Sequence, residues 1–157
     1  MSPNKNSLID VAIIVVLILT ATGGYWFSPM LLPKSDVAVT ADAGCDLNSQ
    51  TCGASLRGGG RIELSISPHP IPMVQPLTVE VRVVGLEAKK AEIDFAGIGM
   101  NMGYNRPELA PAGPGRFAGS ASLPVCITGS MPWQATVLLE TAQERISVPF
   151  RFDSKPH

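Results

Sequence analysis

Sulfur-containing side chains that can bind a soft metal are concentrated in two short stretches of this chain. Residues 97–106 read GIGMNMGYNR, and residues 123–133 read LPVCITGSMPW. Thioether and thiolate groups are soft ligands, and such ligands select Cu(I) over hard ions such as Ca²⁺. The two stretches therefore predict a Cu(I) site in which all four, or three, of these sulfurs are ligands. The candidate ligands are Met100, Met102, Cys126 and Met131.

The same residues have a second interpretation, as packing. Most methionines fill irregular gaps in a core, and Cys126 fits equally well as an inert buried thiol. The glycines around Met100 and Met102 favour a loop, which has little core to fill. The chain has only two histidines, His69 in a Pro-His-Pro turn and His157 at the end of the sequence. We expect neither to be a ligand, which argues against a Cu(II) site.

Two further cysteines form a C-x6-C pair. Cys45 and Cys52 lie within CDLNSQTC, and in an exported protein such closely spaced cysteines predict a disulfide that closes a small loop. Two alternatives to this disulfide remain open. In the first, Cys45 and Cys52 are free thiols that bind a metal or exchange with a partner. In the second, Cys126 forms a disulfide with Cys45 or Cys52.

Charge and motif content argue against two broad classes of function. The chain has 12 Lys and Arg against 13 Asp and Glu, and the basic residues form no patch or stripe of the kind that nucleic acid requires. No Ser, His and Asp are placed as a triad, and no paired acids share a loop. We expect neither a nucleic-acid partner nor an enzyme.

The N-terminal stretch predicts a membrane anchor. Residues 8–27 read LIDVAIIVVLILTATGGYWF, about the twenty residues that span a bilayer core. Tyr25 and Trp26 stand where interfacial aromatic residues are common, and Lys5 favours a cytoplasmic tail over residues 1–7. The prediction is a single-pass inner-membrane protein with its C-terminal part in the periplasm. The alternative is a signal peptide cleaved after Ala21-Thr22-Gly23.

The elements that position the candidate site are strands. Residues 28–60 are polar, rich in Gly, Ala and Asp, and without periodicity, which predicts a tether that contains the Cys45–Cys52 loop, with a seventh strand as one possibility within it. Residues 61–157 contain six short runs of alternating apolar and polar residues, separated by turns rich in Gly and Pro. This pattern predicts an all-β domain, an immunoglobulin-like β-sandwich. The six runs are Arg61–Ser67, Leu77–Val84, Lys90–Phe95, Arg116–Leu123, Trp133–Glu140 and Arg145–Phe152.

Residues 61–152 resemble the exported YtkA-like/FixH-like family and, more loosely, periplasmic copper-binding sandwich proteins. The resemblance is carried by DFAGIGMNMGYNR (94–106) and GRFAGSASLPVCITGSMPWQATV (115–137), together with the single N-terminal span. It implies copper handling and the assembly of respiratory oxidases. The predicted function is a copper chaperone or buffer that passes Cu(I) to a membrane-bound oxidase or a copper transporter. The alternative function is a metal-free, membrane-anchored module that binds another protein.

Overall fold

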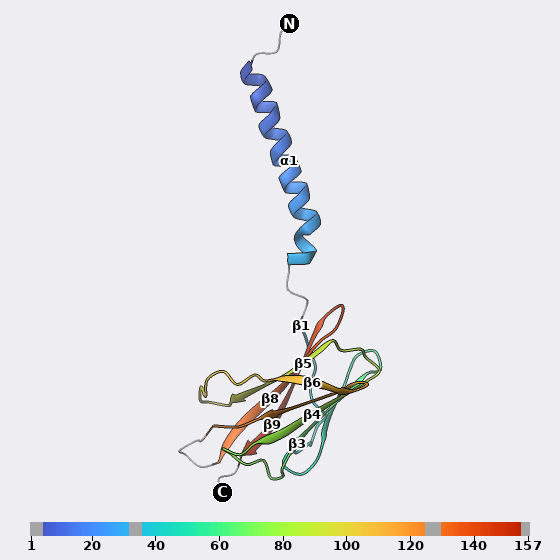
Figure 1. The fold of residues 1–157 in the computed structure, drawn as a ribbon, viewed down its shortest axis with the longest axis vertical. Helices are drawn as coiled ribbons and strands as arrows, with labels where there is room; N and C mark the ends of the chain where they lie inside the picture. The colour runs from blue at the N-terminus through green and yellow to red at the C-terminus, as the bar shows by residue number, and fades with distance from the viewer. Residues whose placement is uncertain (1–4, 32–35, 125–129, 155–157) are drawn as a thin grey trace. The chain divides into compact units, whose positions relative to one another are not determined.

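The computed structural model describes residues 5–31, 36–124 and 130–154, and the chain divides into two compact units, 1–34 and 35–157. The first unit contains one helix, α1 (Lys5–Leu31), which covers the predicted span (Figure 1). The hydroxyls of Thr20 and Thr22 donate to carbonyls one turn earlier in the helix, at Val16 and Ile18. Among the residues that the structure describes, no helix meets the length and hydropathy criteria for a membrane span.

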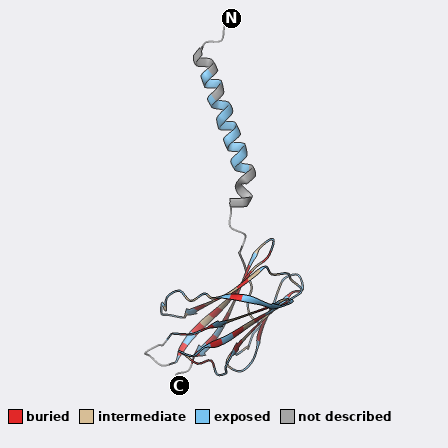
Figure 2. Ribbon diagram, in the orientation of Figure 1, coloured by how far each residue is buried: buried red, intermediate tan, exposed pale blue. Residues whose placement is uncertain are grey.

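The second unit is all-β, as predicted. Each predicted run forms a strand, with ends that differ by a few residues. Buried and exposed residues alternate along these strands, and Figure 2 shows the buried positions as separate bands on the ribbon. The strands are β1 (Asp36–Ala38), β2 (Cys52–Ser55), β3 (Arg61–Ser67), β4 (Leu77–Val84), β5 (Lys90–Gly97), β6 (Glu108–Gly113), β7 (Arg116–Ala121), β8 (Met131–Glu140) and β9 (Arg145–Ser154).

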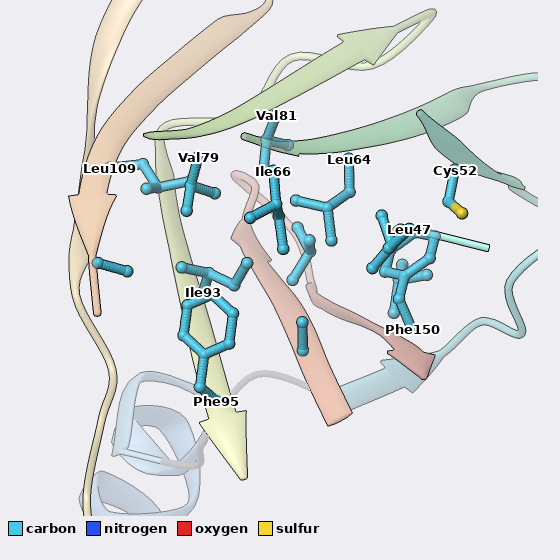
Figure 3. Packing of buried hydrophobic residues seen from close by; sticks show 14 of the residues in the cluster. Leu47, Cys52, Leu64, Ile66, Val79, Val81, Ile93, Phe95, Leu109 and Phe150 are labelled. Atoms are coloured by element: carbon cyan, nitrogen blue, oxygen red, sulfur yellow. The ribbon is translucent and has the colours of Figure 1, made fainter. Parts of the chain in front are cut away.

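All nine strands belong to one sheet, in the order β1-β9-β8-β5-β6-β7-β4-β3-β2, which curls into a half-barrel. β6 joins the two halves, because it pairs with β5 at Glu108 and Leu109 and with β7 from Ala110 onward. The core lies between the halves. Figure 3 shows Leu64 and Val79 of one half opposite Ile93 of the other. Each fully buried Leu, Ile or Val contributes about 1.5–3 kcal/mol.

One strand was not predicted. β6 lies in a stretch where Pro111 and Gly113 indicate a turn, and its pairing with β7 is irregular between these two residues. Proline and glycine are tolerated in a strand at such irregularities. Because proline and glycine are typical of turns, the sequence did not predict β6, the strand that connects the two halves of the sheet.

The predicted tether needs correction. Its residues 36–38 form β1, which runs parallel to β9 with Asp36 opposite Arg145, and residues 52–55 form β2, antiparallel to β3. The two edges of the sheet thus both come from the segment assigned to the tether, and the compact unit begins at Ser35 instead of residue 61. Strands of three and four residues are too short to show an alternating pattern in the sequence.

The predicted disulfide between Cys45 and Cys52 is confirmed, with the two Cα atoms 5.6 Å apart. The loop that it closes packs onto the domain, because Leu47 is fully buried. Asn48 joins two distant segments: its Nδ2 donates to the carbonyl of Asp153 at 2.8 Å, and its Oδ1 accepts from the N–H of Ile71 at 3.0 Å. The bridge uses both cysteines, so neither is paired with Cys126.

Candidate metal centre

The strand directions bring the sulfur-containing loops to one end of the sheet. β3, β5, β7 and β9 end there, and β2, β4 and β8 begin there, as the registers between neighbouring strands require. Every methionine after α1 lies at this end, which we call the methionine end. These methionines are Met73, Met100, Met102 and Met131. Asp36, the first residue of β1, lies at the opposite end of the sheet, beside Arg145 (Figure 1).

Met102 and Met131 converge on Gly97, the last residue of β5. A Cβ on Gly97 would overlap Cε of Met131 and would lie 3.0 Å from Cγ of Met102. Gly97 pairs with Trp133, which places it beside the start of β8. The absent side chain therefore gives two thioether side chains, from loops far apart in the sequence, room to meet at the edge of the core.

Met100 belongs to the same loop but does not join this pair. Its carbonyl oxygen faces Gly97, 2.9 Å from the position of a Cβ there, while its side chain is 46% exposed. The fourth predicted ligand, Cys126, lies outside the described residues. Of the predicted set, the structure thus brings Met102 and Met131 together and leaves Met100 at the surface.

Hydrogen bonds hold the two predicted loops next to each other. Nδ2 of Asn105 donates to the carbonyl of Ser122 at 2.9 Å, and the N–H of Ile98 donates to the carbonyl of Pro132 at 2.9 Å. Within residues 97–106, Oδ1 of Asn101 accepts the N–H of Gly103 at 2.9 Å, and Gly103 has a φ of 81°. Glycine adopts this backbone region without steric cost, which explains the glycines around the methionines.

Trp133 fixes the backbone at Met131. The indole is fully buried, and its Nε1 donates to Oγ of Ser154 at 3.0 Å. Oγ of Ser154 in turn donates to the carbonyl of Met131 at 3.4 Å. Trp133 is therefore a core residue, and its hydrogen bond to Ser154 supports the backbone at Met131. Tyr104, the other aromatic residue near the motif, is 81% exposed.

An ion pair lies on the outer face beside the loop. Arg106 contacts Asp94 at 3.0 Å, and its guanidinium lies 5.4 Å from the ring centre of Tyr104. The hydrogen bond to Asp94 is the main reason that the pKa of Arg106 is raised above its ordinary value. This arginine therefore neutralises the Asp94 carboxylate on the outer face of β5.

Met73 was missed in the sequence. It lies in the turn-rich segment between β3 and β4 and packs partly buried against the core. Counting the six predicted strands as alternating in direction would have placed Met73 at the same end as Met100 and Met102 but opposite Met131, because β6 was not among them. His69 is exposed in the same segment. Among the described residues, no group of three or more His, Cys, Asp or Glu side chains is placed to hold a metal ion.

No protein-family model matches the chain, and no curated protein matches it. Two solved structures are similar to it over part of their length. One is the crystal structure of an engineered protein, with 22% identity and a TM-score of 0.42, covering 60% of this chain and 20% of that chain. The other is a DUF4785 family protein from Legionella pneumophila, with 13% identity and a TM-score of 0.44, covering 62% and 28%. Each of these similarities concerns the fold alone.

Proposed function

We propose that this protein binds Cu(I) at the methionine end and acts as a periplasmic copper chaperone or buffer, in copper delivery or in respiratory oxidase assembly. The observation that carries the proposal is the convergence of Met102 and Met131 on Gly97. Two neutral, soft donors at the edge of an apolar core suit a monovalent soft ion. Met100 and Cys126 are the further donors that the sequence offers.

Retention and release of the ion both follow from this arrangement. Met131 is buried and Met102 is half-buried, so the core side of the site is shielded from water. Met100 is exposed in the same loop, where an incoming ligand meets it first. A site with one closed side and one open side suits exchange of the ion, which a chaperone or buffer requires. No reaction is catalysed in this proposal.

The membrane anchor and the sandwich are part of the same proposal. Apolar side chains of α1 face outward along the helix, among them Ile9, Val15 and Leu19. A helix that is apolar all round suits a bilayer. We propose a single-pass inner-membrane anchor, with the two halves of the half-barrel acting as the two layers of an immunoglobulin-like sandwich. The partner would be a membrane-bound oxidase or a copper transporter.

Competition for Cu(I) tests the function. The full chain in detergent micelles is titrated against Cu(I)-bicinchoninate, a chelate whose absorbance reports copper loss. We expect one tightly bound Cu(I) per chain, weakened at least about tenfold by Met102→Leu or Met131→Leu, because each change removes a donor and keeps the volume. Met73→Leu is the matched control and leaves the affinity unchanged. Equal affinities in all four proteins would contradict the site.

Gly97→Ala gives an independent test of the same geometry. An added Cβ displaces the methyl group of Met131, which is flexible, and the carbonyl of Met100, which belongs to the backbone. We expect copper affinity to fall without the loss of any sulfur. Unchanged affinity in a folded Gly97→Ala protein would show that the ion does not lie at this point.

The second candidate function is metal-free binding of another protein. It is favoured by the exposed apolar side chains at the methionine end, Val74, Ile98 and Met100. Exposed apolar side chains that gather in one region are typical of interaction sites. If the chain fails to take Cu(I) from bicinchoninate in the titration above, this function becomes the better account of the same surface.

A further inference from the structure

We propose that Met100 is a reversible oxidation site, at which hydrogen peroxide converts the thioether to a sulfoxide and thereby weakens copper binding. This inference rests on the proposed Cu(I) function, because it adds a means of regulation to the same site. A sulfoxide presents a hard oxygen where the thioether presents a soft sulfur, and Cu(I) prefers soft donors. Met102 and Met131, the two methionines at Gly97, keep their thioethers.

The first argument is the difference in exposure among the methionines that the structure describes in the β unit. Met100 is 46% exposed, whereas Met131 is 4% exposed, and Met73 and Met102 pack partly buried against the core. A peroxide molecule must reach the sulfur atom to oxidise it, so the rate of oxidation follows exposure. Among these four residues, Met100 is therefore expected to react first.

The second argument is the open backbone on both sides of Met100. Residues 98–101 are four consecutive exposed positions. A Cβ added at Gly99 or at Gly103 would meet no atom within 4 Å. Methionine sulfoxide is reduced by enzymes, and the oxidised side chain has to enter their active sites. A segment with free space around its backbone suits both the approach of peroxide and the later repair.

Met131 shows why the position of the sulfur decides the consequence of oxidation. Its Cε packs so closely against Gly97 that a Cβ there would overlap it. A sulfoxide oxygen on Met131 would place a polar group in the apolar core without a partner, which destabilises the fold. An oxygen added to the exposed Met100 is hydrated instead. Oxidation at Met100 therefore changes the set of donors and leaves the domain folded.

The hydrogen bonds that hold this loop do not use the Met100 side chain. The N–H of Ile98 donates to the carbonyl of Pro132 at 2.9 Å, and Oδ1 of Asn101 accepts the N–H of Gly103 at 2.9 Å. The loop therefore keeps its conformation when the Met100 side chain is oxidised. The loss of copper affinity is then limited to the contribution of one donor, so the switch is partial and reversible.

The reaction is an oxygen transfer in which sulfur loses two electrons. A lone pair of the Met100 sulfur attacks one oxygen of hydrogen peroxide, the O–O bond breaks, and an S–O bond forms. The departing hydroxide takes the proton from the transferred oxygen and leaves as water. Reduction reverses the change: a dithiol supplies two electrons and two protons and becomes a disulfide, and the sulfoxide oxygen leaves as water.

Peptide mass spectrometry after timed exposure to hydrogen peroxide locates the reactive sulfur. The full chain in detergent micelles, free of metal, should gain one oxygen at Met100 about tenfold faster than at Met131, with Met73 and Met102 between them. The same exposure in concentrated urea is the control, because all four side chains are then accessible and their rates should become similar. Oxidation of Met131 as fast as Met100 in the folded chain would overturn the site.

Titration against Cu(I)-bicinchoninate measures the consequence for copper. The untreated wild type should bind Cu(I) about tenfold more tightly than untreated Met100→Leu, which lacks the same donor. After equal exposure to peroxide and its removal, the two proteins should bind Cu(I) with similar affinity. Met100→Leu is the matched control, because any other oxidised group, Cys126 included, is present in both proteins. Methionine sulfoxide reductases with a dithiol, removed before the titration, should restore the difference.

The outcomes separate the inference from the function on which it rests. If Met100 is oxidised and the treated wild type still binds Cu(I) more tightly than treated Met100→Leu, the regulation is overturned and Cu(I) binding stands. If Met100 reacts no faster than the buried methionines, the oxidation site is overturned and the copper function is again unaffected. A wild-type chain that takes no Cu(I) from bicinchoninate overturns the function and, with it, the regulation.

Discussion

Two segments at the methionine end are attached to the domain in opposite ways. Residues 45–52, the disulfide loop, are held by side chains: Leu47 is buried in the core, and Asn48 bonds to Ile71 and to Asp153. Residues 98–106 are held by backbone hydrogen bonds and by the part-exposed side chains of Asn105 and Arg106, and none of their side chains is fully buried.

The difference shows which segment is built for stability and which is free to bind. A segment fixed by a buried leucine, a bridging amide and a disulfide resists displacement. A loop that buries no side chain fully keeps side chains available, and here these include Met100 and Tyr104, both exposed. We therefore expect substitutions in residues 45–52 to change the free energy of unfolding, and substitutions in residues 98–106 to change copper binding.

The largest effect should come from Leu47→Ala. This change leaves a cavity at a fully buried position and is expected to reduce the free energy of unfolding by about 2–5 kcal/mol. Met100→Leu, the counterpart in the loop, should change it by less than about 0.5 kcal/mol. Urea denaturation followed by the fluorescence of buried Trp133 measures both. Similar values for the two variants would remove the distinction between the segments.

Loss of the disulfide should have the next largest effect. Replacing both Cys45 and Cys52 by alanine releases a small loop, and the loop-entropy model gives about 2–3 kcal/mol for a closure of this size. The expected result is a lower urea midpoint with unchanged Cu(I) affinity, since neither sulfur belongs to the proposed site. A fall in affinity that exceeds the fall in stability would place the cysteines in the copper function after all.

Asn48→Ala should come third. It removes two hydrogen bonds and leaves the N–H of Ile71 without the partner it has in the structure, which costs about 1–3 kcal/mol. Asn101→Ala is the control in the loop, because its side chain bonds only to the nearby Gly103 N–H in an exposed turn. Thermal unfolding of both proteins compares them, and a larger drop for Asn101→Ala would contradict the contrast.

The smallest effect concerns Lys90, which contacts Glu92 and Glu108 at 3.0 Å each where the sheet halves join. Hydrogen bonds to Glu92 and then Glu108 raise the pKa of Lys90 above its ordinary 10.5. Its contribution to stability is therefore complete below pH 10.5 and is lost as the pH rises through the higher folded value. Lys90→Met should be slightly less stable than wild type at pH 8, with a gap that closes as the pH rises beyond the ordinary lysine pKa of 10.5 in urea titrations.

The sequence predicted those strands whose two faces differ. β3 and β8 alternate because one face lies against the core. It did not predict β1 and β2, since three- and four-residue edge strands of small or polar residues show no period. β6 was hidden because Pro111 and Gly113 indicate a turn wherever they stand.

The residue types of the candidate site could be identified in the sequence, whereas their arrangement in space could not. Residue type alone singled out Met102 and Met131 as soft donors. Their approach to Gly97 depends on the register of β5 against β8, in which Gly97 lies opposite Trp133. This register depends on residues far apart in the sequence, so neither strand's own sequence predicts it. The outward position of Met100, one residue from a glycine with a φ of 86°, depends on loop geometry in the same way.

X-ray absorption at the copper edge of the Cu(I)-loaded full chain tests the central claim most directly. We predict a first coordination shell dominated by sulfur, with fewer sulfur neighbours in the Met102→Leu/Met131→Leu double variant and no change in Met73→Leu. A shell of nitrogen and oxygen, or the same number of sulfur neighbours in the double variant as in the wild type, would contradict a Cu(I) site at Gly97.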